Sequence, residues 1–201
     1  MRAREIMTSP VITVRPETSV RAAAAILAER GFTALPVVDE DDQLVGIVTE
    51  ADLVRDRFLR DPRFLIYDRH PPEVVETELV GDVMTSPVTA MDDDCDVADL
   101  TTALLKANLR SMPIVDGGRL IGIVTRRDLV RIVGRADIAI AADVRHHLEV
   151  YGGPNRWTVQ VRDGVVTITD RFDDETDRHV AVTLAEAVPG VARVLIEASH
   201  D

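Results

Sequence analysis

One stretch of the sequence occurs twice, and this duplication limits the possible folds more than any other feature. The copy at 44–55 reads LVGIVTEADLVR, and the copy at 120–131 reads LIGIVTRRDLVR. Each begins with β-branched apolar residues typical of a buried strand and continues with a helical pattern. Thr49 and Thr125 stand where a helix N-cap belongs, with an Asp three residues later as in a capping box. A hydroxyl and a carboxylate at a helix N-terminus form a natural site for a phosphate and a ribose.

The duplication extends to a domain-sized unit. The segment MTSPV at 7–11 recurs at 84–88, and LPVVD at 35–39 corresponds to MPIVD at 112–116. The offset is 77 residues for both segments and 76 for the Gly-Ile-Val-Thr strand, because the turn after Asp39 is one residue longer than its counterpart. A repeat tolerates a change of length in such a turn.

The same order of elements, β-α-β-β-α, is predicted in each copy. The first copy has a strand at 11–14 and a helix at 19–30. The second copy has the corresponding strand at 88–90 and helix at 97–107. Two strands joined by an acidic or Gly-rich turn then lead into the helix after the Thr.

Residues with special backbone preferences mark the boundaries of these elements. Gly31 and Asn108 follow the two predicted helices and are expected to end them in the left-handed conformation. Pro36 and Pro113 mark strand starts or edges, because Pro cannot donate to a strand ladder. Between the copies, 61–78 contains three prolines and mixed charge, so we predict a linker with one helical turn before the second MTSP segment.

A different pattern begins after residue 135. A helix is predicted at 137–150, followed by strands at 157–161 and 165–169. These strands flank Asp163-Gly164, a strong hairpin signal because Gly tolerates the positive φ that a two-residue turn requires.

The remainder of the tail completes a small unit. Thr176 is a candidate N-cap for a helix to about Val188. Pro189-Gly190 ends that helix, and 191–197 reads as a final strand. The tail is therefore predicted to be an α-β-β-α-β unit of its own.

Charge and composition exclude several classes of function. The net charge of −12 argues against nucleic-acid binding and against electrostatic binding to anionic lipid. Cys95 is the only cysteine, so the chain forms no intrachain disulfide and no cysteine-based metal site. The start lacks the apolar run of a signal peptide, and the apolar run at 22–28 is too short to span a bilayer. We expect a soluble, cytoplasmic protein.

With these motifs in view, residues 1–135 resemble a tandem pair of CBS (cystathionine-β-synthase-type) domains, often called a Bateman module. The MTSPV segments, the Pro-Val-Val-Asp and Pro-Ile-Val-Asp strands and the Gly-Ile-Val-Thr-x-x-Asp segments match in both copies and in order. The resemblance implies an α+β fold with two β-α-β-β-α repeats in a pseudo-twofold pair. Repeat 1 is expected at 1–60, the linker at 61–78 and repeat 2 at 79–135.

The tail at 136–201 resembles a BON (bacterial OsmY and nodulation) domain. The likeness lies in the segments VQVRDGVVTI and VPGVARV. The family usually has Gly just after the second strand, whereas Asp170 stands there in this chain. The fold assignment does not depend on this position, but a function tied to that Gly does.

The CBS resemblance implies an adenosine-containing ligand. In that family the Thr hydroxyl and the Asp carboxylate typically contact the ribose or phosphate, which points to Thr49 and Asp52 and to Thr125 and Asp128. The adenine is usually held in an apolar slot by strand backbone. That slot corresponds to Ala34, Leu35 and Val11 in one repeat and to Ser111, Met112 and Val88 in the other. The alternative is that each Thr and Asp only caps a helix.

The two predicted sites differ in charge. Glu50 follows Thr49 and would repel a phosphate, whereas Arg126 and Arg127 follow Thr125 and would attract one. We therefore expect a charged nucleotide to prefer the Thr125 side, with Arg110 as a second phosphate contact. The Thr49 side would be weaker, empty or suited to an uncharged adenosyl group. Alternatively, these arginines pair with the acidic run at 92–96.

No catalytic or metal-binding constellation stands out. The acidic run at 92–96 lacks the Gly and the distal Glu of an EF-hand loop, so a solvated helix start is favoured. His146 and His147 are adjacent and face different directions on a helix. The sequence has neither a phosphate-cradling Gly-rich loop that opens a helix nor a Gly-x-Ser-x-Gly segment. We expect a non-catalytic protein with no obligatory cofactor.

Two functions are consistent with these features. The first is a homodimeric sensor that binds AMP, ADP, ATP, S-adenosylmethionine or a cyclic dinucleotide in its CBS pair and relays this to a partner through the tail. The second is a dimeric adaptor whose tail binds a protein or phospholipid, with a purely structural CBS pair. The acidic charge and the absent signal peptide weigh against the phospholipid version.

Overall fold

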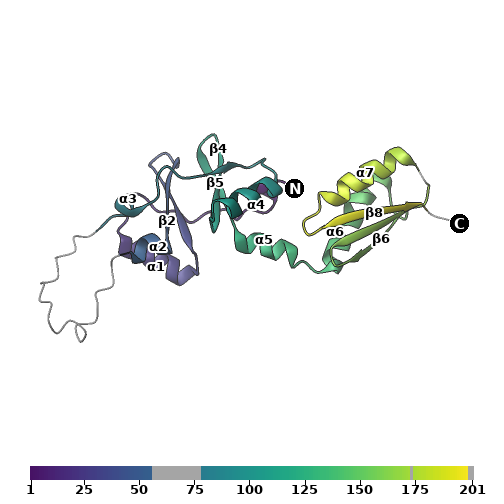
Figure 1. Ribbon diagram of the computed structural model, residues 1–201. Helices are drawn as coiled ribbons and strands as arrows, with labels where there is room; N and C mark the ends of the chain where they lie inside the picture. The colour runs from purple at the N-terminus through teal and green to yellow at the C-terminus, as the bar shows by residue number, and fades with distance from the viewer. Residues whose placement is uncertain (56–77, 173, 199–201) are drawn as a thin grey trace, which may run out of the picture. The chain divides into compact units, whose positions relative to one another are not determined.

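The computed structural model describes residues 1–55, 78–172 and 174–198 (Figure 1). The chain forms two compact units, one spanning Arg2–Thr125 and the other Arg126–Asp201 together with Met1. The predicted linker at 61–78 lies, apart from Glu78, outside the described residues, and a four-residue helix, α3 (Val80–Val83), directly precedes the second MTSP segment. The division at Thr125 places the last helix of the second repeat with the tail, whereas the sequence repeat continues to residue 135.

The first repeat forms a small α/β layer. It contains the 3-10 turn η1 (Ala3–Glu5), helix α1 (Val20–Arg30), strands β1 (Ala34–Val38) and β2 (Leu44–Thr49), and helix α2 (Glu50–Val54). Ser19 Oγ accepts a hydrogen bond from the Ala22 amide at 3.2 Å, and Gly31 ends α1 with φ of 65°. The helix predicted at 19–30 is thus confirmed. Apolar residues of these elements form one core together with Val14 and with Val80 of helix α3 (Val80–Val83): Val14, Val20, Ala23, Leu27, Leu35, Val37, Val48, Leu53 and Val80.

The second repeat has the same elements up to its last strand. They are α3 (Val80–Val83), β3 (Met91–Asp92), α4 (Val97–Lys106), β4 (Ser111–Asp116) and β5 (Arg119–Thr125). Asp96 caps α4 by accepting a hydrogen bond from the Ala98 amide at 2.8 Å. Asn108 follows α4 with φ of 53°, as predicted. Leu100, Leu104, Met112, Ile114 and Val124 are completely buried.

The first predicted strand of each repeat is shorter than expected. At 11–14 only Val14 pairs, as an isolated parallel bridge with Val37. The strand predicted at 88–90 is wrong: pairing begins at Met91, where the two-residue β3 lies parallel to β4. The residues just before each segment pair with the sheet of the other repeat, at Thr8 and Thr85. Each segment therefore reaches the sheet of its own repeat only at its C-terminal end.

This crossing is reciprocal between the two repeats. Thr8 exchanges backbone hydrogen bonds with Ile123 of the second repeat, at 2.9 and 3.2 Å. Thr85 does the same with Ile47 of the first repeat, at 2.9 and 3.1 Å. Thr8 and Thr85 are equivalent positions of the sequence repeat, and so are Ile47 and Ile123. The duplicated sequence therefore forms the same contact twice.

The glycine of each Gly-Ile-Val-Thr strand is required by this interface. The side chain of Met7 lies over Gly122, and the side chain of Met84 lies over Gly46. A β-carbon at either glycine would collide with the thioether, so each strand needs Gly for the close approach of the other repeat.

The two strand prolines lie inside their strands. Pro36 is the third residue of β1, which forms a two-stranded sheet with β2 and is therefore an edge strand, as expected. Pro113 is the third residue of β4, the central strand of the sheet β3-β4-β5. On its β3 side β4 pairs only at Ile114 and Val115, so no ladder partner stands opposite Pro113 there.

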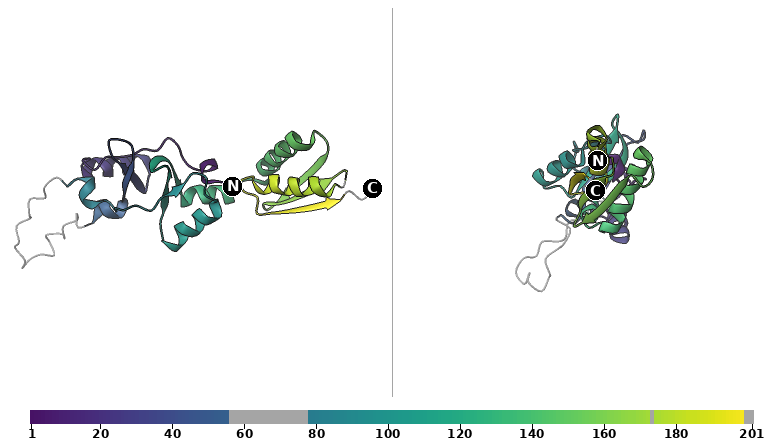
Figure 2. Two further views of the ribbon diagram at one scale, coloured as in Figure 1. Left: turned by 90° about the horizontal axis from the view of Figure 1, so that it is seen from above. Right: turned by 90° about the vertical axis from the view of Figure 1, so that its right-hand side faces the viewer.

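The second unit contains helix α5 and the predicted α-β-β-α-β tail. Its elements are α5 (Arg126–Val133), α6 (Asp137–Gly152), β6 (Trp157–Arg162), β7 (Val165–Asp170), α7 (Glu175–Glu186) and β8 (Arg193–Ala198). Strand β7 is central, antiparallel to β6 and parallel to β8. Helices α6 and α7 cover one face of this sheet (Figure 2). The tail core comprises Ile140, Val144, Leu148, Val159, Val166, Ile168, Ala181, Ala185 and Val188.

Two local predictions for the tail have different outcomes. Asp163 and Gly164 form the β6–β7 turn with φ of 50° and 75°, which confirms the hairpin. Thr176 as the N-cap of α7 is wrong, because Asp174 caps this helix with hydrogen bonds from the amides of Thr176 and Asp177. A carboxylate two residues earlier offers the stronger acceptor, so the helix begins there.

The end of α5 is fastened to the tail. Arg135 donates a hydrogen bond to the Pro189 carbonyl at 2.7 Å and forms an ion pair with Asp143 at 2.6 Å. Gly190 has φ of 94°, and a β-carbon there would lie 3.2 Å from the Ile132 carbonyl oxygen. Contacts this tight explain why α5 belongs to the compact unit of the tail. Within the parts of the chain that the structure describes, no helix has the length and apolar character needed to cross a bilayer.

Candidate functional site

The first-repeat site is built by the β1–β2 hairpin and the start of α2. The strand register places Ala34 directly opposite Thr49. The Thr49 amide and hydroxyl both donate to one carboxylate oxygen of Asp52, at 2.9 and 2.7 Å. The predicted Thr and Asp are therefore in contact, and their contacts in this structure are those of a helix cap.

The hairpin residues of the second repeat pair in the same way as those of the first. The β4–β5 register places Ser111 opposite Thr125 and Met112 opposite Val124. Helix α5 starts directly after Thr125, and Asp128 lies in its first turn. Asp128 is only 8% exposed and forms an ion pair with Arg131 at 3.2 Å.

The residues predicted to form the adenine slots differ in how deeply their side chains are buried. The side chains of Leu35 and Met112 are completely buried in the core, so only their backbone is available to a ligand. Ala34 and Ser111 are also buried, at 8% and 6% exposure. Val11 and Val88 are half-buried on the segments that lead to the bridge at Val14 and to β3.

Arg110 has an unexpected partner. It precedes Ser111 in the second repeat, yet its guanidinium forms an ion pair with Glu50 of the first repeat at 3.3 Å. Both side chains are exposed. The pair differs from both sequence-based expectations, which were a phosphate contact on the Thr125 side and an ion pair with the acidic run at 92–96. It brings a cation to the Thr49 site, next to the carboxylate predicted to repel phosphate.

The tail contains a buried ionic cluster that sequence reasoning missed. Asp170 is completely buried, and its two carboxylate oxygens accept hydrogen bonds from Arg156 at 3.1 and 3.2 Å. The same guanidinium forms an ion pair with Asp177 at 2.5 Å and lies 4.4 Å from the centre of the Trp157 ring. Asp170 also accepts a hydrogen bond from the Phe172 amide at 3.1 Å. The cluster joins β6, the end of β7 and α7.

The hydrogen bonds of this cluster determine the charge states of its acids. Burial alone would raise the pKa of Asp170, but the hydrogen bonds from Arg156 and from the Phe172 amide outweigh it and hold that pKa below its ordinary value. The Tyr151 hydroxyl, which donates to Asp177 at 2.8 Å, and Arg156 lower the pKa of Asp177. The sequence contains one signal for this cluster. The second strand of the predicted hairpin is followed by Asp170, and the first strand is preceded by Arg156.

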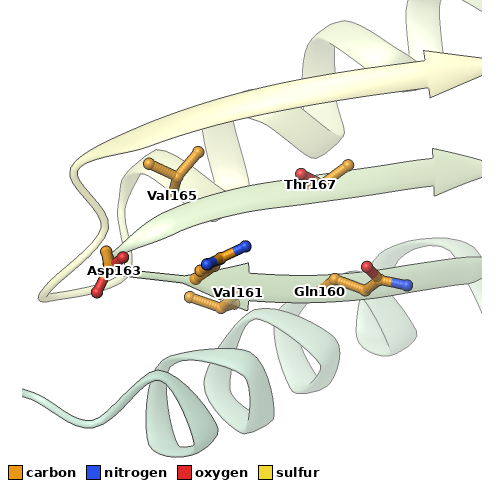
Figure 3. Close-up of a pocket in the computed structure, with 6 residues that line it drawn as sticks. Gln160, Val161, Asp163, Val165 and Thr167 are labelled. Carbon is orange, nitrogen blue, oxygen red and sulfur yellow. The ribbon is translucent and has the colours of Figure 1, made fainter.

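The other face of the tail sheet is not covered by α6 or α7. Register places Arg162, Val165 and Arg193 in one row across the three strands, on the face opposite the core residue Val166. A depression of about 650 Å³ lies here (Figure 3). Its lining consists of Gln160, Val161, Arg162, Asp163, Val165 and Thr167.

The comparisons with known proteins identify the repeated unit. The family model described as CBS domain matches the chain at residues 3–57 and again at 80–135, which together exceed half of its length. The chain belongs to the CBS domain family. The two matched segments confirm the tandem CBS assignment, and the Thr and Asp residues above are those of its two CBS repeats.

Relatives match the CBS pair. The Methanopyrus kandleri protein MK0525 is 31% identical over 129 residues, which cover 64% of this chain and 60% of that protein. CBS domain-containing protein CBSX2, chloroplastic, of Arabidopsis thaliana is 33% identical over 140 residues, covering 59% and 56%. Inosine-5'-monophosphate dehydrogenase of Methanocaldococcus jannaschii is 32% identical over 131 residues, covering 65% and 23%. The matched region thus spans between 23% and 60% of these three proteins.

Solved CBS pairs share the fold and hold adenosine compounds. CBSX2 in complex with AMP has a TM-score of 0.54 and 34% identity, and the match covers 65% of this chain and 93% of that chain. The CBS domain pair of protein MJ0100, in complex with 5-methylthioadenosine and S-adenosyl-L-methionine, has a TM-score of 0.53 and 29% identity, with coverage of 67% and 96%.

Proposed function

We propose that this protein is a non-catalytic regulatory module that binds an adenosine-containing ligand in its CBS pair. The main support is that two solved CBS pairs of similar sequence hold AMP or the adenosyl compounds 5-methylthioadenosine and S-adenosylmethionine. The proposed ligand residues are Thr49, Asp52, Ala34, Leu35 and Val11 in one repeat, and Thr125, Asp128, Arg126, Ser111, Met112 and Val88 in the other.

Calorimetric titration of the full chain tests this proposal. AMP, ATP and S-adenosylmethionine are titrated into the wild type and into the variants Asp52→Ala and Asp128→Ala. Micromolar binding that is lost in one variant and kept in the other assigns the dominant site to one repeat. Binding that survives both substitutions unchanged contradicts the assignment of these carboxylates. Heat from none of the three ligands contradicts the proposed function.

The proposed relay to the tail runs through α5. Asp128 lies on this helix, and the residue Arg135 beyond its end is bonded to Pro189 and Asp143. A ligand that engages Asp128 would act on a helix packed with the tail, and its differential affinity for two arrangements would shift their populations. Hydrogen exchange of 137–152 and 188–192 with and without AMP tests the relay. Saturating AMP that leaves exchange in both segments unchanged contradicts it.

We also propose that the tail is BON-like and that the protein is a homodimer. The element order α6-β6-β7-α7-β8 fits the first proposal. For the second, Val130 and Val133 are 69% and 84% exposed and one helical turn apart on α5, a surface that a second copy would cover. Sedimentation analysis of Val133→Glu should give a monomer at concentrations where the wild type is a dimer. A monomeric wild type contradicts the dimer proposal.

A second candidate function is an adaptor that uses the open face of the tail sheet. The row formed by Arg162, Val165 and Arg193 supports it, because two cations flank an apolar side chain on a face that neither tail helix covers. Cosedimentation with anionic liposomes distinguishes the versions. Saturable, salt-resistant binding favours a phospholipid, and absence of binding leaves a protein partner.

A further inference from the structure

The ion pair between Glu50 and Arg110 joins the two repeats next to the first-repeat Thr and Asp. The guanidinium and carboxylate are 3.3 Å apart, and the two side chains are 72% and 51% exposed. Glu50 directly follows Thr49, and its amide donates to the Thr33 carbonyl at 3.2 Å, which fixes the start of α2 beside the β1 strand. Arg110 comes from the other repeat and reaches this position only because the two repeats pack together.

We infer that Glu50 sets the charge selectivity of the first-repeat site by holding Arg110. This inference rests on the proposed function. A guanidinium free to turn toward a ligand would form charge-assisted hydrogen bonds with a phosphate. Glu50 pairs with that guanidinium and adds its own negative charge to the site. A nucleotide phosphate that binds Arg110 must therefore displace the Glu50 carboxylate from the guanidinium and still be repelled by that carboxylate nearby. The site therefore favours an adenosyl ligand without a phosphate, such as 5-methylthioadenosine, over AMP.

The test uses Asp128→Ala as the background, so that the first-repeat site dominates. AMP and 5-methylthioadenosine are titrated calorimetrically into this variant with and without Glu50→Gln. Breaking an exposed ion pair of about 0.2–1 kcal/mol corresponds to about a 1.4- to fivefold gain in AMP affinity. Affinity for uncharged 5-methylthioadenosine should not change. S-adenosylmethionine, whose sulfonium is positive, should bind more weakly to Glu50→Gln.

Arg110→Ala separates release of the guanidinium from simple loss of repulsion. If Glu50 acts mainly by holding Arg110, Glu50→Gln produces a much smaller gain in AMP affinity once Arg110 is alanine. A gain of undiminished size in the double variant overturns the inference, because the effect would then come from repulsion alone. An equal change for AMP and 5-methylthioadenosine overturns it as well, because a charge effect must distinguish the two ligands.

Asp42→Asn is the matched control. Arg119 and Asp42 form another exposed ion pair between the repeats, at 3.2 Å, with Arg119 at the start of β5 and Asp42 in the β1–β2 turn. Its loss should leave the ratio of the two affinities unchanged, and a change equal to that of Glu50→Gln would overturn the inference. Binding by the wild type that disappears entirely in Asp128→Ala overturns the inference and leaves the proposed function standing. Absence of binding in the wild type and in every variant overturns both.

Discussion

Replacing Arg156 by methionine removes the cation from the buried cluster of the tail and retains most of the apolar stem. Asp170 is completely buried and Arg156 is 13% exposed, so the change leaves a carboxylate in the interior without its main partner. Breaking a buried ion pair by removing one member costs about 3–5 kcal/mol. That is a large share of the free energy of unfolding of a small domain.

The pH dependence of this loss has a definite sign. In the wild type the pKa of Asp170 is lowered from 3.8, so the stability from its charged form is complete above 3.8 and is lost as pH falls through the lowered pKa. In Arg156→Met burial is no longer opposed by the guanidinium, so the pKa of Asp170 rises above 3.8. The variant therefore regains stability as pH falls toward 3.8, and its difference from the wild type shrinks.

Trp157 makes the measurement specific to the tail. It is the only tryptophan of the chain, and Arg156 lies against its ring. Urea unfolding is followed by its fluorescence at pH 7 and at two lower values above pH 4. Arg162→Met is the control, because Arg162 is an exposed arginine at the end of β6, the strand that follows Arg156, and should change stability by less than about 0.5 kcal/mol.

Two results would refute this reasoning. A loss below about 1 kcal/mol at pH 7 would mean that the cluster is worth no more than a surface ion pair. A difference between wild type and Arg156→Met that does not shrink at lower pH would mean that Asp170 is not the group left unpaired. Arg156→Lys keeps a positive charge but cannot form the bidentate pair, so its free energy of unfolding should lie between those of the wild type and Arg156→Met.

Three further substitutions probe local features of the structure. Gly190→Ala should destabilise the tail by at least about 1 kcal/mol, because φ of Gly190 is 94° and the new β-carbon would lie 3.2 Å from Arg135 Cβ. Urea unfolding followed by Trp157 fluorescence measures this loss, and an unchanged urea midpoint would contradict the prediction. Gly122→Ala should lower the stability of the CBS pair by about 1–3 kcal/mol, because the Met7 side chain must move to make room for the new methyl group. Calorimetric melting measures this change, and an unchanged Tm would show that the Met7 thioether moves without cost. Thr49→Ala should lower stability by about 1 kcal/mol, measured by the same method, through loss of the cap. A neutral effect would show that the hydrogen bond from Thr49 to the Asp52 carboxylate does not stabilise the fold.

Features with local causes could be predicted from the amino-acid sequence. Gly31 ends α1, and Asp163-Gly164 forms the hairpin turn, because a positive φ depends on the residue and its immediate neighbours. The CBS resemblance predicted one site for Ala34 and Thr49, and the two residues lie opposite each other because a short hairpin fixes its own register. The cap of α7 was misplaced, because two acceptors compete at that helix start and the carboxylate of Asp174 prevails over the Thr hydroxyl.

Interactions between residues far apart in the chain depend on the folded structure. Residues 11–14 form a single bridge because the preceding segment crosses to the other repeat, which the pattern of one repeat does not encode. Arg110 meets Glu50 across 60 positions, and Arg156 meets Asp170 across 14. Arginines and acids are numerous in this chain, and a local pattern sets the charge of each position but not its partner. The fold decides which charges are buried, and burial makes the pairing of Asp170 necessary.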